Sequence, residues 1–205
     1  EIAQCLVGSE MCIRDSYIFG LNMILKGFSD QAVTTLGLYY KWQSFFFIPL
    51  GAMQTCIVPV ISYNYGAGMY DRCKKTLKDA VIFGWTLMII GTLCFEIIPG
   101  PMLSVFSRDA KVIEIGVNAF HIIGMSFILL VTSLTFPVYF QAIGQSVKSS
   151  LLTVFRTAVL FVPLAFIFSR IGGLDWFWLT FPVTDSLSTL LGFIWYKKFM
   201  RRPYA

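Results

Sequence analysis

The chain has 205 residues, of which 57% are hydrophobic and only 13% are charged. Average globular chains carry about 25% charged residues, so the composition excludes a water-soluble domain of this length and predicts an integral membrane protein. The net charge of +5 does not indicate nucleic-acid binding, because the basic residues cluster at the ends of apolar runs. The five cysteines are spread singly and there is one histidine, so the sequence predicts neither a metal site nor a redox cofactor.

Residues 1–16, EIAQCLVGSEMCIRDS, differ from the rest because they show no helical period and their charges interrupt any membrane signal. CLVGSEMCIRDS resembles a peptide translated from a sequencing adapter, which predicts a non-native scar; a native polar linker is the alternative. An apolar stretch begins abruptly at Tyr17 without an initiating Met, so we expect the chain to be a fragment. Residues 17–26 are too short to span a bilayer and predict only the end of a helix.

The first full span is predicted at residues 35–65. It contains the stretch QSFFFIPLGAMQTCIVPVISY at 43–63, which carries no Asp, Glu, Lys or Arg, and a helix crosses the hydrocarbon core with about 20 apolar residues. The stretch nevertheless holds polar side chains, Gln43 and Gln54 among them, and two prolines. A spanning helix tolerates such residues where they face protein or a water-filled cavity, so the pattern favours transport across a membrane.

Basic residues follow this span in YDRCKKTLKD, residues 70–79, and predict a short amphipathic helix on the membrane surface. The next span is predicted at 80–98 and ends before Pro99, because proline removes a backbone donor and blocks continuation of the helix. Residues 102–106 form a short apolar patch that we expect at the membrane interface.

The next span is predicted at 112–143, as one long helix that Pro137 kinks near its far end. Two more follow at 149–169 and 174–197, each interrupted by a single charge, with a glycine pair between them that predicts a tight turn. The predicted fold class is therefore all-α integral membrane, with five full spans and one partial span.

Loop charges predict the orientation, because basic residues are enriched on the cytoplasmic side. If the spans alternate, nine basic residues lie on the side of segment 70–79, Lys148 and the C-terminal tail, against four on the other side. The sequence thus predicts a cytoplasmic C-terminus.

Four segments in chain order carry a family resemblance. ISYNYGAGMYDRCKKTLKDA resembles the loop after the eighth helix of bacterial multidrug and toxic compound extrusion (MATE) transporters, and FSRDAKVIEIGVNAFHII resembles the start of their tenth helix. YFQAIGQSVKSSLLTVFR is similar to the joint between their tenth and eleventh helices, and GLDWFWLTFPVTDSLSTLL to their twelfth. Order and spacing match over residues 17–205, most nearly with the MepA-type branch.

The resemblance implies the second of two six-helix lobes around a central cavity, with the first helix of the lobe truncated, in a bacterial inner (plasma) membrane. Together with the missing N-terminal lobe, it implies a secondary antiporter rather than an enzyme. Such a protein exports organic cations or other toxic compounds in exchange for H⁺ or Na⁺ and needs no cofactor. Sodium-coupled members resemble one another in having an acid within the seventh and tenth helices. Here the seventh helix is truncated and the middle of the tenth has no acid, so the coupling ion stays open.

Two alternatives remain. A lipid-linked oligosaccharide flippase of the same superfamily would favour an arginine-rich cavity, and Arg156 is the one arginine available. A structural or enzymatic membrane subunit belongs to another class. An enzyme would need a clustered nucleophile or metal triad, which the sequence does not contain, and a structural role leaves the polar groups in the spans unexplained.

Polar groups inside the spans are the candidates for an ion or substrate pathway. Glu114, Asn118 and His121 are spaced i, i+4, i+7 and share one helix face, where they could bind a proton or help hold Na⁺; solvated groups at headgroup depth are the alternative. Arg156 and Asp185 are the only charges in the last two spans. We expect them to pair, either to fix helix packing or to serve transport.

The uncharged candidates are Gln43, Gln54 and Gln141, which suit a cavity for varied cations and polar drugs, or else hydrogen bonds between helices. Ser188 lies on the same helix face as Asp185 and is predicted to bind its remaining carboxylate lone pair.

Overall fold

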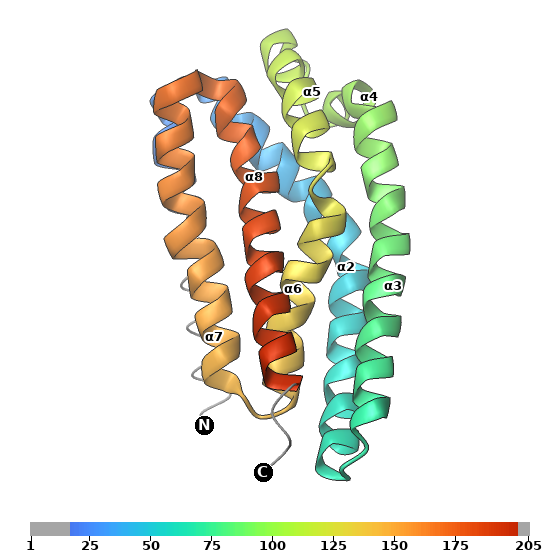
Figure 1. Ribbon diagram of the computed structural model, residues 1–205. Helices are drawn as coiled ribbons and strands as arrows, with labels where there is room; N and C mark the ends of the chain where they lie inside the picture. Colours follow the sequence, from blue (N-terminus) through green and yellow to red (C-terminus); the bar gives the residue numbers. More distant parts are fainter. Residues whose placement is uncertain (1–16, 201–205) are drawn as a thin grey trace.

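The computed structural model describes residues 17–200, and the suspected scar at 1–16 lies outside the described residues. The described part is a bundle of long helices without strands (Figure 1), which confirms the all-α fold class. In chain order the helices are Tyr17–Lys26, α2 (Asp30–Gly66), α3 (Tyr70–Ile97), α4 (Pro99–Ser104), α5 (Ala110–Gly124), α6 (Phe127–Ala142), α7 (Ser146–Val154), the π-helix η1 (Phe155–Phe161) and α8 (Val162–Met200).

Three helical runs are long and apolar enough to cross a membrane, namely Asp30–Gly66, Tyr70–Ile97 and Ser146–Lys198. The bent pair of α5 and α6 makes a fourth if it is counted as one span. The run Ser146–Lys198 reverses at Gly173, whose φ of 69° and ψ of −146° are not helical, and its two arms lie antiparallel (Figure 1). Counted as two arms, it brings the long crossings among the described residues to the five that the sequence predicts.

Residues 70–79 do not form a separate surface helix, which corrects that prediction. They are the first turns of α3, which continues without a break from Tyr70 to Ile97. Cys73 and Leu77 of this segment are buried against α2 and α6. Because the segment has a packed face, it extends the span instead of lying on the membrane. The patch at 102–106 is corrected in part, since Met102 and Leu103 are buried inside the bundle.

The prediction of one continuous helix over residues 112–143 is wrong, because the chain bends by 56° between α5 and α6. α6 itself continues through Pro137, and the kink at this proline stays a prediction. Gly124 and Ser126 flank the bend, and glycine and serine are common at helix breaks. Thr92 donates to the carbonyl of Gly124 (3.1 Å) and Ser126 to that of Ile123 (2.8 Å), so hydroxyl groups satisfy carbonyls beside the break.

Close packing holds the bundle together, because helices in lipid gain little from the hydrophobic effect and associate through van der Waals contact and hydrogen bonds. Phe95 stacks on Phe120 with ring centroids 4.4 Å apart, at the contact of α3 with α5. Small residues let helices approach closely. A Cβ on Gly84 would lie 2.6 Å from a methyl group of Val131 on α6.

The two ends of the bundle carry different charge. The turns α2–α3 and α6–α7 lie at the same end as the last residues of α8 (Figure 1), as the alternating spans require. Lys41, which the charge count omitted, lies over the ring of Phe106 at the opposite end, 5.0 Å from its centroid. That end therefore has five basic residues instead of four, still fewer than the seven at the other end within the described part of the chain.

Candidate functional site

A buried ion pair joins η1 to the second arm of α8, the part of this helix that follows Gly173. Arg156 on η1 donates from Nε (3.1 Å) and Nη2 (2.8 Å) to a single oxygen, Oδ1, of Asp185. The Asp185 side chain is 1% exposed and that of Arg156 is 17% exposed. Charge-assisted hydrogen bonds are strong where water is excluded, so the two charges that interrupt the last spans lie together as a pair.

Two irregular backbone segments meet at this pair. Arg156 belongs to a π-helical stretch, a widened helix that often occurs at functional sites. Ser126 and Ser133, from the α5–α6 bend and from α6, interact with the carboxylate of Asp185. The prediction that Ser188 binds this carboxylate is wrong, because its hydroxyl oxygen has no hydrogen-bond partner among the described residues.

Three hydroxyl side chains spaced four residues apart on α8 form what we call the α8 seam: Thr180, Thr184 and Ser188. All three are buried, and their oxygens have no hydrogen-bond partner within residues 17–200. Elsewhere, helical hydroxyls donate to the carbonyl four residues earlier, as Thr35, Thr135 and Thr157 do. The α8 seam hydroxyls are therefore not used by their own helix, and they lie within two turns of Asp185.

A second pair joins α3 to α5. Nδ1 of His121 lies 2.8 Å from Oε2 of Glu96, and both side chains are about one-third exposed, at 38% and 32%. The other carboxylate oxygen of Glu96 is buried without a partner in the described part of the chain. Sequence reasoning missed Glu96, whose only signal was a charge at the end of an uncharged run.

Glu114 and Asn118 lie apart from this pair. They line an open hollow of about 290 Å³ between α5 and the start of the second arm of α8, together with Lys111 and Asp175. Both are exposed. The structure thus divides the predicted group of three, since His121 binds Glu96 and does not line this hollow.

The glutamines also divide. Gln43 and Gln54 lie on one face of α2, because eleven residues make about three helical turns. Leu50 and Ile57 on that face are buried, and both glutamines are half-buried. Nε2 of Gln54 has no hydrogen-bond partner among the described residues, whereas Gln141 is exposed at the end of α6.

The opposite side of α2, which we call the α2 outer face, is exposed and mixed in character. Thr55 and Cys56 lie there among apolar and small side chains; the face comprises Phe45, Ile48, Ala52, Thr55, Cys56, Pro59 and Tyr63. The exposed side of the second α8 arm has Leu187, Leu190, Phe193 and Ile194, with Ser186 among them. Polar groups in spanning helices favour protein or water over lipid, and the α2 outer face has two such residues, Thr55 and Cys56, against one on the α8 arm.

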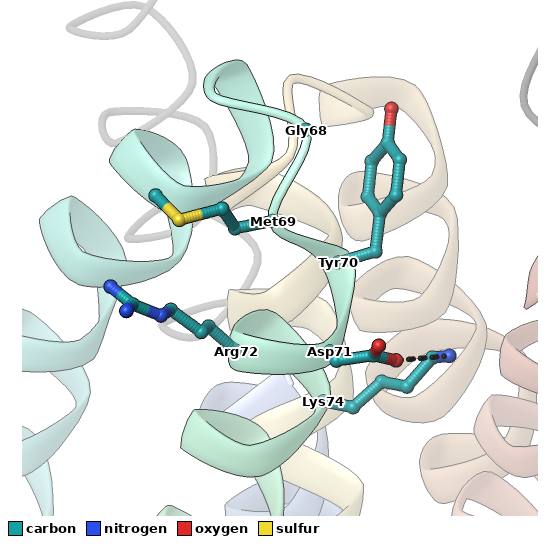
Figure 2. A pocket seen from close by; sticks show the side chains of 6 residues that line it. All are labelled: Gly68, Met69, Tyr70, Asp71, Arg72 and Lys74. Carbon is teal, nitrogen blue, oxygen red and sulfur yellow. Dashed lines mark hydrogen bonds and ion pairs between the residues drawn. The ribbon is translucent and has the colours of Figure 1, made fainter.

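Another hollow lies at the α2–α3 turn, at one end of the bundle. It has about 400 Å³ and is lined by six consecutive or nearly consecutive residues, Gly68 to Arg72 and Lys74. Figure 2 shows Lys74 turned toward Asp71, 3.1 Å away, while Arg72 points to the other side. Asp71 is 98% exposed at its side chain, so this is an open surface turn and not an enclosed ligand site.

The family model described as MatE matches residues 7–167 of the chain. The chain belongs to the MatE family. Among curated MatE-like relatives, the multidrug export protein MepA of Staphylococcus aureus (strain MSSA476) is 21% identical over 170 residues, covering 83% of this chain and 37% of MepA. A FAD transporter of Shewanella oneidensis is 26% identical over 176 residues, covering 80% of this chain and 36% of that protein.

Solved structures share the fold of this MatE chain. An outward-facing multidrug resistance MATE transporter matches with a TM-score of 0.90 at 17% identity, over 97% of this chain and 46% of that one. A MOP superfamily transporter from Pyrococcus furiosus matches with a TM-score of 0.88 at 19% identity, over 95% of this chain and 44% of that one. The MatE chain therefore shares the fold of part of these proteins and spans under half the length of the relatives it matches.

Proposed function

We propose that this chain is the C-terminal lobe of a secondary antiporter that exports organic cations or other toxic compounds in exchange for H⁺ or Na⁺. The observation that carries the proposal is the coverage of the fold match. Nearly all of the chain, 97%, superimposes on 46% of a multidrug resistance MATE transporter, as one of two lobes would. The remaining N-terminal lobe is then the partner, and rocking of one lobe against the other gives alternating access.

In this proposal the α2 outer face lines the cavity between the lobes, and the exposed side of the second α8 arm meets lipid. Organic cations suit such a cavity because aromatic faces attract them, and Phe45 and Tyr63 are exposed there. The charge distribution supports a cytoplasmic C-terminus in a bacterial inner membrane.

A flippase for lipid-linked oligosaccharides has less support. Its phosphate groups require free cationic side chains, and Arg156, the one arginine of the spans away from their ends, is bound to Asp185. A phosphate would therefore have to displace the carboxylate.

The transport proposal is tested in vesicles that contain either this chain alone or the complete transporter of which it is a lobe. We expect dye efflux driven by an H⁺ or Na⁺ gradient from the complete transporter and none from the lobe, because the cavity needs both lobes. Efflux from the lobe alone would refute the two-lobe requirement, and no efflux from the complete transporter under either gradient would refute antiport.

The assignment of the α2 outer face is tested by cysteine labelling of the complete transporter with a membrane-impermeant maleimide. We expect a variant with Cys56 as its only cysteine to be labelled, and a transported cation to slow the reaction. The matched control is a variant whose only cysteine is Leu190→Cys, with Cys56 also replaced. Both positions are exposed and lie ten residues before the ends of their helices, Gly66 and Met200. Labelling at 190 but not at 56 would reverse the assignment.

A further inference from the structure

The carboxylate of Asp185 is only partly paired, because only one of its two oxygens accepts hydrogen bonds from its cationic partner, Arg156. Both N–H donors of Arg156 converge on Oδ1, whereas a bidentate pair would use both oxygens. What else reaches the carboxylate is neutral, the hydroxyl groups of Ser126 and Ser133. Each of these hydroxyls also has a backbone acceptor, since Ser126 donates to the carbonyl of Ile123 and Ser133 to that of Leu130.

The surroundings of the pair contain further polar groups that the packing leaves unused. The α8 seam places three buried hydroxyls without partners along about 12 Å of helix on either side of Asp185, at 1.5 Å per residue. Buried polar groups in proteins are normally hydrogen-bonded, often through water. Hydroxyl groups without a protein partner can therefore hold water or pass on a proton near Asp185. A pair that only fixed the helix packing would not need such groups.

From this arrangement we propose that Asp185 is a proton-binding site inside the lobe, with Arg156 as the partner that holds the carboxylate ionised until a proton arrives. The inference rests on the proposed antiport and names the coupling ion and its site. Uptake of the proton forms an O–H bond on the carboxylate and weakens the two hydrogen bonds from Arg156. No electron is transferred and no group leaves.

The guanidinium keeps its charge in this step and needs new acceptors. The charged and titratable groups that interact with the pair are few. Tyr39 of α2 interacts with both charges, and Tyr17 and Tyr40 interact with Arg156. Their phenolic oxygens can accept from the released N–H groups. Because Arg156 lies on the π-helical stretch and Ser126 at the α5–α6 bend, a change at Asp185 acts on both irregular segments at once.

A proton is favoured over Na⁺ by the same geometry. Hard metal cations need several oxygen ligands, and one of the two carboxylate oxygens already accepts from a guanidinium that would repel a second cation.

The test uses the complete transporter in proteoliposomes and separates a coupling role from a packing role. In the double variant Arg156→Met/Asp185→Leu, apolar side chains of similar size replace the pair, which often leaves stability unchanged. We expect this variant to fold and to exchange labelled substrate across the membrane, but to lose efflux driven by a pH gradient. The matched control is Asp71→Asn, which removes an exposed acid from a surface pair and leaves pH-driven efflux unchanged.

A second variant keeps the inference testable if the double variant does not fold. Arg156→Lys retains the charge but loses the paired donors to Oδ1, so the carboxylate takes up a proton more easily and the pH profile of efflux moves toward higher pH. An unchanged pH profile, or pH-driven efflux by the double variant equal to the wild type, would overturn the proton site. So would wild-type efflux that follows a Na⁺ gradient and ignores pH, although antiport itself would then stand.

Discussion

Removal of Arg156 should cost this protein more stability than removal of any surface charge. In Arg156→Met the carboxylate of Asp185, 1% exposed, loses its cationic partner. Two charge-assisted hydrogen bonds of 3.1 and 2.8 Å disappear with it, each of which contributes about 1.5–3 kcal/mol. Breaking a buried ion pair on one side costs about 3–5 kcal/mol in other proteins, and we expect a loss of that size in the free energy of unfolding.

The assay is unfolding of the complete transporter in mixed micelles with increasing denaturing detergent, followed by tryptophan fluorescence at pH 7.5 and again at about pH 5. The loss should shrink at the lower pH, because a protonated carboxyl group leaves no uncompensated charge. In the double variant Arg156→Met/Asp185→Leu most of the lost stability should return. The control Lys74→Met, in a pair whose side chains are 46% and 98% exposed, should cause no measurable change. A loss below about 1 kcal/mol in Arg156→Met would refute the description of Asp185 as a buried, ionised group.

Three further predictions concern packing and are measured by the same unfolding assay. Gly84→Leu should cost about 1–3 kcal/mol through overpacking against α6, whereas Gly51→Leu faces open space and should cost little; equal losses would contradict the close contact. Gly173→Ala should cost about 1–3 kcal/mol because its φ of 69° and ψ of −146° suit glycine alone, and unchanged stability would show that the turn tolerates a side chain. Trp42→Phe should cost about 1 kcal/mol by removing the 3.0 Å hydrogen bond to the Met102 carbonyl, and no change would mean that water replaces it.

Some features of this lobe follow from local composition. The apolar runs predict the crossings, because insertion depends on the summed hydrophobicity of about 20 consecutive residues. The turns are equally local, since Gly68, Gly144 and Gly173 all take positive φ, a conformation that glycine adopts without strain. The single charges in the last two spans were also visible as outliers, since an unpaired charge in a span is costly.

Other features depend on which helices lie side by side. α6 continues through Pro137, whereas the chain bends by 56° after Gly124, whose carbonyl accepts a hydrogen bond from the hydroxyl group of Thr92 on α3. His121 turns to Glu96, a residue 25 positions away on another helix. Neither contact has a trace in the local pattern, because it depends on the rotation and depth of two packed helices.

The amino-acid order of this chain thus specifies how many helices cross the membrane, where they turn and which charges they carry inward. It also predicts that Arg156 and Asp185 pair, because they are the only charges in the last two spans, and the structure confirms this pair. It does not specify the other partners. Hydrophobicity and turn propensity are sums over neighbours in the chain, whereas the contact of His121 with Glu96, and the failure of Ser188 to join Asp185, depend on close packing between segments far apart in the sequence.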